Sequence, residues 1–177
     1  MRLQVAVLCC SSCLLFSTVT PAHADELPAR KAGLWEMKMT LPTGQEQTTR
    51  QCTDPSTEKA MQNMALAGGI MTCSKLDIRK TAGGYTVDAV CSMSSPMAMT
   101  TTSHTEYTGD FSSAYTMKQT GRVEMDKMPP QNTNTTIQAK WQGACPSGWK
   151  PGDTELPGGR RMNLLTAAAN ATAGGKP

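Results

Sequence analysis

Apolar and polar residues alternate over several stretches of about ten residues, which is the pattern of half-buried β-strands. The first stretch places Trp35, Met37, Met39 and Leu41 on one face. Later stretches alternate in the same way or are rich in threonine, and short turns with glycine, proline or aspartate separate them. The predicted strands cover residues 34–41, 45–53, 72–81, 85–93, 97–107, 113–125 and 135–145. This pattern predicts a mainly β fold, an antiparallel meander of about seven strands that forms a curved sheet or an up-and-down barrel.

The segment 72–93 carries the clearest hairpin signal, because two strand-like arms flank the turn sequence Ala-Gly-Gly at 82–84. If the apolar faces of the two arms coincide, Ile78 lies opposite Val87. Leu76 then lies opposite Ala89, two positions further along the same face.

One segment breaks the alternation and predicts a single α-helix. Asp54 is suited to cap the helix, because its side chain accepts a hydrogen bond from a free backbone N–H, and Pro55 suits the first helical position. Met61 and Met64 recur at helical spacing, and the glycine pair 68–69 ends the segment.

The first 24 residues have the features of a secretory signal peptide. Arg2 is followed by an apolar stretch, 5–19, that is too short to cross a bilayer as a helix. A small-x-small motif then places the cleavage site between Ala24 and Asp25. We therefore expect export to the periplasm.

Cleavage leaves a β-rich domain, 25–146, and a Pro/Gly-rich C-terminal tail, 147–177, that we expect to be mobile, with one weak helix at 164–173. The formal net charge is only +3, and the signal peptide contains one of the arginines. Such a weak charge gives no reason to expect nucleic acid or an anionic membrane as the partner. No segment after the signal peptide has the 18 consecutive apolar residues of a transmembrane helix.

Seven cysteines are present, three in the predicted signal peptide and four after it: Cys52, Cys73, Cys91 and Cys145. An even number in an exported chain predicts two disulfides. A zinc site is disfavoured, because no two of these cysteines have the usual ligand spacing.

Strand parity favours the pairs Cys52–Cys73 and Cys91–Cys145. In the 72–93 hairpin, Cys73 and Cys91 point to opposite faces, so a bond between them would need a β-bulge. Cys91 and Cys145 share the apolar parity of their strands, and Cys52 and Cys73 bracket the helix. All three pairings remain formally possible.

Several short motifs occur in a defined order along the chain. They are Gly33-Leu34-Trp35-Glu36, Cys52 after a threonine-rich strand, Cys73 and Cys91 on either side of Gly83-Gly84, Gly109-Asp110-Phe111 before Tyr115, and Gly143-x-Cys145. In this order, over roughly residues 28–146, the chain resembles the exported bacterial family catalogued as domain of unknown function 3617. The resemblance implies a β-rich protein of the Gram-negative envelope. That family has no established activity, so the resemblance assigns no catalytic residue.

Residues for enzyme chemistry are scarce. His104 is the only histidine after the signal peptide, and its neighbour Ser103 would point to the other face of a strand, so the two do not form a base–nucleophile pair. After the predicted signal peptide, the chain has no serine-nucleophile elbow, phosphate-binding glycine loop or Cys-x-x-Cys motif. We therefore expect a non-catalytic protein with no catalytic residues and no cofactor.

The methionines are the unusual feature, since 12 of the 13 follow the signal peptide. They could fill an irregular core, line a pliable cavity for an apolar ligand, or bind copper(I) through their thioethers. The predicted apolar ligand face contains Trp35, Met37, Met39, Met97, Met99, Met117 and Trp141. Copper binding by Met37, Met39, Met97 and Met99 is the alternative function. The leading expectation is an uncharacterised periplasmic protein that binds an apolar small molecule or an envelope protein.

Overall fold

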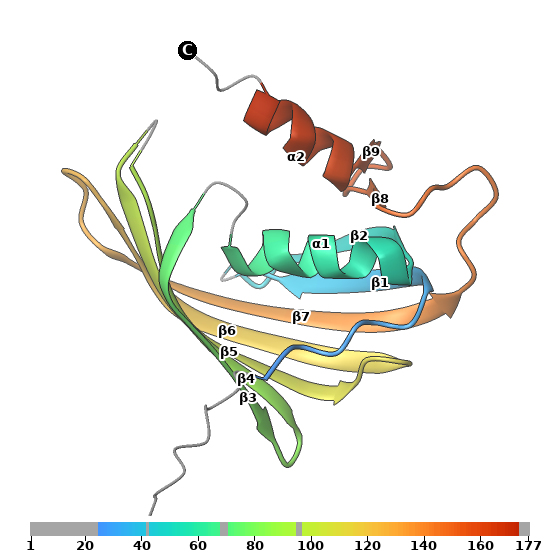
Figure 1. The fold of residues 1–177 in the computed structure, drawn as a ribbon, viewed down its shortest axis with the longest axis horizontal. Helices are drawn as coiled ribbons and strands as arrows, with labels where there is room; N and C mark the ends of the chain where they lie inside the picture. Colours follow the sequence, from blue (N-terminus) through green and yellow to red (C-terminus); the bar gives the residue numbers. More distant parts are fainter. Residues whose placement is uncertain (1–24, 42, 68–70, 95–96, 174–177) are drawn as a thin grey trace, which may run out of the picture.

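The computed structural model describes residues 25–41, 43–67, 71–94 and 97–173. The strands are β1 (Gly33–Thr40), β2 (Glu46–Thr53), β3 (Thr72–Thr81), β4 (Gly84–Met93), β5 (Met99–Asp110), β6 (Ala114–Met125), β7 (Gln131–Gly143), β8 (Asp153–Glu155) and β9 (Arg161–Asn163), and the helices are α1 (Pro55–Ala67) and α2 (Leu164–Ala173). Within these ranges the strands form one sheet in the order β3-β4-β5-β6-β7-β1-β2-β8-β9. Figure 1 shows that the sheet is curved, with α1 on its concave side and α2 beyond α1.

The predicted mainly β fold is confirmed, and the seven predicted strands correspond to β1–β7. Every pairing is antiparallel, and the β3–β4 hairpin has the expected register, with Ile78 opposite Val87 and Leu76 opposite Ala89. β7 pairs with β1 instead of ending the sheet. The sheet stays open, because β3 and β9 are its two edges.

The two faces of the sheet differ in polarity, as the alternation predicts. Met37, Ala139 and Tyr115 are paired across β1, β7 and β6, so their side chains share the concave face. The convex face carries threonines and charged residues. Arg122 there forms an exposed ion pair with Glu124, at 2.8 Å from Nε to Oε1.

Helix α1 begins as predicted. The backbone N–H of Thr57 donates to Oδ1 of Asp54 at 2.9 Å, and Pro55 occupies the first helical position. Met61 faces the protein interior and is 6% exposed. The side chain of Met64 and the glycine pair 68–69 lie outside the described residues.

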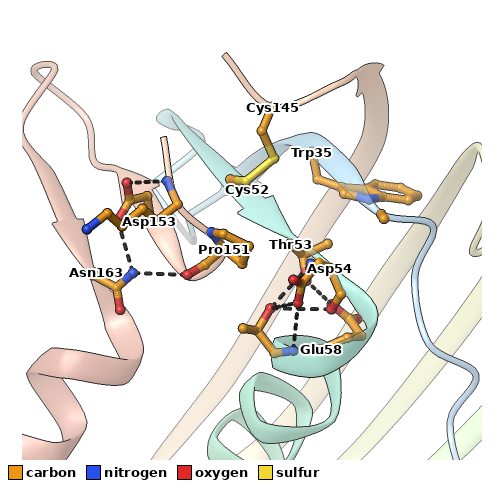
Figure 2. Close-up of a disulfide and its surroundings, with 12 residues drawn as sticks. Trp35, Cys52, Thr53, Asp54, Glu58, Cys145, Pro151, Asp153 and Asn163 are labelled. Atoms are coloured by element: carbon orange, nitrogen blue, oxygen red, sulfur yellow. Dashed lines mark hydrogen bonds between the residues drawn. A yellow bond between two sulfur atoms is a disulfide. The ribbon is translucent and has the colours of Figure 1, made fainter. Parts of the chain in front are cut away.

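The C-terminal segment adds two short strands that the alternation did not predict, and the weak helix expected at 164–173 forms as α2. β8 extends the sheet beyond β2, and the N–H of Gly152 donates to the carbonyl of Cys52 at 2.8 Å. The side chain of Asn163 donates to Asp153 at 3.0 Å and accepts from the N–H of Thr166, in the first turn of α2. Figure 2 shows this polar junction beside Cys52. The mobility of the tail stays a prediction.

The favoured disulfide pairing, Cys52–Cys73 with Cys91–Cys145, is wrong. The structure forms Cys73–Cys91 and Cys52–Cys145. β3 contains an irregularity between Cys73 and Lys75 that places Cys73 directly opposite Cys91. Ser74 is the extra residue in β3, and because of it the side chains of Cys73 and Cys91 lie on the same face, which regular strand parity would not allow.

The second bond, Cys52–Cys145, follows from the position of β1 between β2 and β7. Leu34 in β1 pairs with Cys52 on one side and with Gly143 on the other. The chain beyond β7 then crosses the start of β1, and the two cysteine Cα atoms lie 5.5 Å apart. Figure 2 shows this disulfide at the end of the sheet. The predicted signal peptide, 1–24, lies outside the described residues.

Candidate ligand pocket

A cavity of about 380 Å³ lies between α1 and the concave face of the sheet. Its lining comes from the sheet, from α1, from the start of α2 and from the segment before β1. The lining side chains are mostly apolar: Leu27, Arg30, Met37, Gln51, Glu58, Met61, Gln62, Tyr107, Phe111, Tyr115, Met117, Ile137 and Leu164. The volume is near the lower end of the range for small-molecule sites, roughly 300–1,000 Å³.

Five of the chain's few aromatic residues form one cluster, and three of them, Tyr107, Phe111 and Tyr115, line the cavity. The Phe111 and Tyr115 rings stack with centroids 4.8 Å apart, and Trp35 packs against Tyr115 at 5.7 Å. Tyr107 and Tyr85 each pack against Phe111 at 6.0 Å. Trp35 is fully buried. The cluster gives the pocket a rigid wall, because aromatic side chains have few rotatable bonds.

Residues 25–32, which we call the strap, run across the sheet before β1 begins. The carboxylate of Asp25 accepts a hydrogen bond from the N–H of Lys80 in the edge strand β3 at 2.8 Å. At the other end, the N–H of Lys31 donates to the carbonyl of Phe111 at 2.9 Å. In Figure 1 the strap is the blue segment that leads from β3 and β4 toward β1.

The strap is also tied to α1 and contributes to the pocket. Gln62 of α1 donates to the carbonyl of Pro28 at 2.9 Å. Leu27 and Arg30 of the strap both line the cavity. The strap therefore closes one side of the space between helix and sheet.

A close backbone approach fixes the junction between the strap and β1. The indole N–H of Trp141 donates to the carbonyl of Ala32 at 3.0 Å, and the ammonium group of Lys31 lies 3.6 Å from the centre of the Trp141 ring. Gly33 follows with φ +132°, and a Cβ atom at this position would lie 2.2 Å from the carbonyl oxygen of Gly143. This close approach explains why a glycine stands here.

A buried ion pair between the strap and α1 forms the polar part of the pocket. Arg30 Nε lies 2.7 Å from Oε1 of Glu58, and Nη2 lies 3.1 Å from Oε2. Arg30 also donates to Gln51 at 2.7 Å, and Glu58 accepts from the hydroxyl of Thr53 at 2.7 Å. Glu58 is 0% exposed and Arg30 is 8% exposed. Both charges are therefore compensated at short range.

The electrostatics of the pocket follow from burial and from this pair. Burial acts to raise the pKa of Glu58, but the hydrogen bonds and charge of Arg30 outweigh it and lower that pKa. Burial acts to lower the pKa of Arg30, and Glu58 reverses that effect and raises it. Burial raises the pKa of Tyr107 to about 12 and also raises that of Tyr115. At neutral pH both phenols are protonated and the ion pair is fully charged.

The structure brings together only part of the predicted apolar ligand face. Met37 and Met117 line the pocket. Trp35 lies buried in the adjacent aromatic cluster, and Trp141 lies on the same face of the sheet, where it contacts the strap. Met39 is half-buried on the same face, opposite Ile137.

The other two residues of that predicted face lie elsewhere. Met99 is eight residues along β5 from Tyr107, which corresponds to roughly 26 Å in a strand. Met97 precedes β5 and is 50% exposed. Because β1 and β5 are also separated by two strands, the pairs Met37/Met39 and Met97/Met99 do not converge on one position.

Sequence reasoning missed the polar residues of the pocket. Arg30 lies in a segment without strand or helix periodicity. Glu58 is in the first turn of the predicted helix, where an acidic side chain is explained by its interaction with the helix dipole. Glu58 did carry a usable signal, because it lies one turn before Met61, which faces inward. Nothing in the sequence pattern indicated that Arg30, three residues before β1, would reach Glu58.

His104 lies on the convex face, as its parity indicates. Its Nδ1 is 2.8 Å from Oδ1 of Asp88, and its Nε2 is 3.6 Å from Oε1 of Glu106. The hydrogen bond with Asp88, opposed by slight burial, raises the pKa of His104. Ser103 points to the opposite face. Within the described ranges, no group of three or more histidine, cysteine, aspartate or glutamate side chains is placed to hold a metal ion.

Two findings bear on cellular context. The two disulfides indicate an oxidising, extracytoplasmic compartment. Neither helix in the described part of the chain has the length and apolarity needed to cross a membrane.

Comparisons with known proteins give one match. No curated protein and no solved structure matches the chain. The model of the family described as "Protein of unknown function (DUF3617)" matches residues 30–145, from the buried arginine of the strap to the second disulfide. The chain therefore belongs to the DUF3617 family.

Proposed function

We propose that this protein is a non-catalytic periplasmic binding protein that holds an apolar small molecule in the cavity between α1 and the concave sheet. The observation that carries the proposal is the cavity itself, about 380 Å³ with a mostly apolar lining. Methionine side chains repack easily and can fill gaps. A cavity that stays open although Met37, Met61 and Met117 line it is therefore suited to accept a ligand.

The construction of the cavity supports the same proposal. Its walls come from the strap, five strands of the sheet and both helices, and both ends of the Arg30–Glu58 pair are satisfied within it. An apolar site with a few fixed polar groups is the usual form of a small-molecule pocket. The periplasm fits the predicted signal peptide and the disulfides.

A fluorescent probe tests this proposal directly. N-phenyl-1-naphthylamine is neutral and apolar, and its emission rises in an apolar site. We expect saturable binding of one probe per chain. Ile137→Trp places a large ring in the cavity and should weaken probe binding about tenfold or more, a change of about 1.4 kcal/mol or more. Gln138→Trp is the matched control, because the neighbouring residue is exposed on the convex face.

Two results would overturn the proposal: no saturable binding to the unmodified protein, or equal binding by the two tryptophan variants.

The cellular location is tested separately. Protein recovered from the periplasmic fraction should begin at Asp25 in an intact-mass measurement, and recovery of the unprocessed chain in the cytoplasm would contradict it.

A further inference from the structure

The charges that line the pocket are already paired, and this restricts the ligand. Arg30 uses Nε and Nη2 on Glu58 and Gln51, and its guanidinium carbon lies 5.8 Å from the centre of the Trp35 ring. Glu58 accepts from Arg30, from Thr53 and, at 3.4 Å, from Gln62. In the described part of the chain, every buried side-chain nitrogen and oxygen has a hydrogen-bond partner. The lining therefore has no net charge and no unused buried cation.

A charged ligand head would be penalised in such a site. A carboxylate on the ligand would compete with Glu58 for Arg30 or bind Nη1, which contacts the sulfur of Met37 at 3.9 Å. In either case two buried carboxylates would share one guanidinium, and the site would carry an uncompensated negative charge. An ammonium head would have to compete with Arg30 for Glu58 in the same way. An unpaired charge in a low-dielectric site is strongly unfavourable.

The cavity nevertheless contains a neutral donor that suits a ligand head. Tyr107 lines it, and burial, not a hydrogen bond, is the main cause of its raised pKa. Its phenol is therefore protonated at neutral pH and can donate to an acceptor on a ligand. Tyr115 differs, because its hydroxyl interacts with Arg30.

We propose, on the basis of the proposed function, that the pocket selects uncharged amphiphiles: one apolar chain or ring system with a hydrogen-bond-accepting head, such as an alcohol or an ester. The carboxylate of the same chain length binds more weakly. The acceptor head binds Tyr107, and the apolar part lies against Met37, Met117 and Ile137. The small volume fits one such chain better than a whole phospholipid.

Displacement of bound N-phenyl-1-naphthylamine by compounds that share a ten-carbon chain tests the inference at pH 7.5. We expect 1-decanol and methyl decanoate to displace the probe at concentrations at least about tenfold lower than decanoate does. Equal displacement by decanoate would overturn the inference and leave the proposed function intact. Absence of probe binding would instead count against the proposed function itself.

Two variants locate the selectivity. Glu58→Gln leaves the charge of Arg30 without its counter-ion, so the affinity for decanoate relative to decanol should rise at least about tenfold. An unchanged ratio in a folded Glu58→Gln protein would overturn the assignment to this pair. If this variant does not fold, the comparison of 1-decanol and methyl decanoate with decanoate in the unmodified protein still tests the selectivity against charge, because the three compounds share a ten-carbon chain and only decanoate is charged.

Tyr107→Phe tests the neutral donor. The variant should weaken decanol binding several-fold, and by a larger factor than it changes binding of the probe, which makes no such hydrogen bond. Tyr85→Phe is the matched control, because Tyr85 faces Tyr107 across the β4–β5 pair but does not line the cavity. Equal effects of both variants on decanol would overturn the role of Tyr107.

Discussion

The concave face of this sheet has two ends that differ although the same strands build both. At one end, which we call the closed end, Trp35, Phe111 and Tyr115 lie beneath α1 and the strap. At the other, which we call the open end, Met99 and Met125 face each other across β5 and β6 and are only half-buried. Strand alternation places all of these residues on one face. Burial is then decided by what covers each end, and only the closed end has the strap across it.

The two ends also differ in their covalent ties. Cys52–Cys145 fastens the closed end and joins residues 93 positions apart. Cys73–Cys91 lies within the β3–β4 hairpin and joins residues 18 positions apart. A bond that closes the longer loop removes more conformational entropy from the unfolded chain. The closed end is therefore expected to hold most of the stability.

Removing each disulfide is the largest test of this comparison. Replacing Cys52 and Cys145 by serine should lower the free energy of unfolding by about 4–5 kcal/mol, and replacing Cys73 and Cys91 by about 3 kcal/mol. Urea unfolding followed by circular dichroism measures both. A greater loss from the hairpin pair would contradict the assignment of stability to the closed end.

The buried ion pair gives the next effect. Glu58→Gln leaves Arg30 buried without its partner, so we expect the free energy of unfolding to fall by about 3 kcal/mol or more. Glu124→Gln breaks the exposed Arg122–Glu124 pair and should change it by less than about 1 kcal/mol. Similar losses from the two variants would show that the strap and α1 do not bury this pair in solution.

The same pair predicts an acid-dependent loss of stability. The pKa of Glu58 is lower in the folded protein than its unfolded value of about 4.3. The contribution of the pair is therefore fully present above about pH 4.3 and is lost as the pH falls through the folded-state pKa. Urea titrations between pH 7 and pH 3 should show a smaller acid loss in Glu58→Gln than in the unmodified protein. An identical acid dependence would contradict the role of Glu58.

The strands could be predicted from the sequence because the alternation of apolar and polar residues is a local property. The hairpin register at Ile78 and Val87 and the cap at Asp54 were predictable for the same reason. The disulfides were not, because a single bulge near Cys73 reverses the parity on which the argument depended. The helix at 164–173 was predicted. β8 was not, because a strand of three residues is too short to show an alternation of apolar and polar positions.

Only the pocket residues that lie on strands could be predicted, because strand alternation is local and the contacts of the strap are not. Met37 and Met117 were found because they share the apolar parity of their strands. Met97 and Met99 share that parity argument but lie toward the open end. Arg30 was missed because its position depends on a long-range approach of the strap to α1, and no local pattern records such a contact.

A matched pair of valines compares the burial of two positions on the concave face. Val87 in β4 is 2% exposed, whereas Val123 in β6, toward the open end, is half-buried. Val87→Ala should lower the free energy of unfolding by about 2 kcal/mol, and Val123→Ala by less than about 1 kcal/mol. Equal losses would mean that the open end is covered as fully as the position of Val87.

The convex face supplies the smallest effect and the opposite pH dependence. The hydrogen bond to Asp88 raises the pKa of His104 in the folded protein above its unfolded value of about 6.5. Its contribution is therefore present below about pH 6.5 and is lost as the pH rises through the folded-state pKa. Because the imidazole is exposed, His104→Gln should change stability by less than about 1 kcal/mol, measurable at pH 5.5 and absent at pH 8.5. Glu106 also faces the ring at 3.6 Å, so Glu106→Gln should reduce the difference only slightly. A larger loss at pH 8.5 than at pH 5.5 would contradict the assigned pairing, because the charged imidazole would then oppose folding.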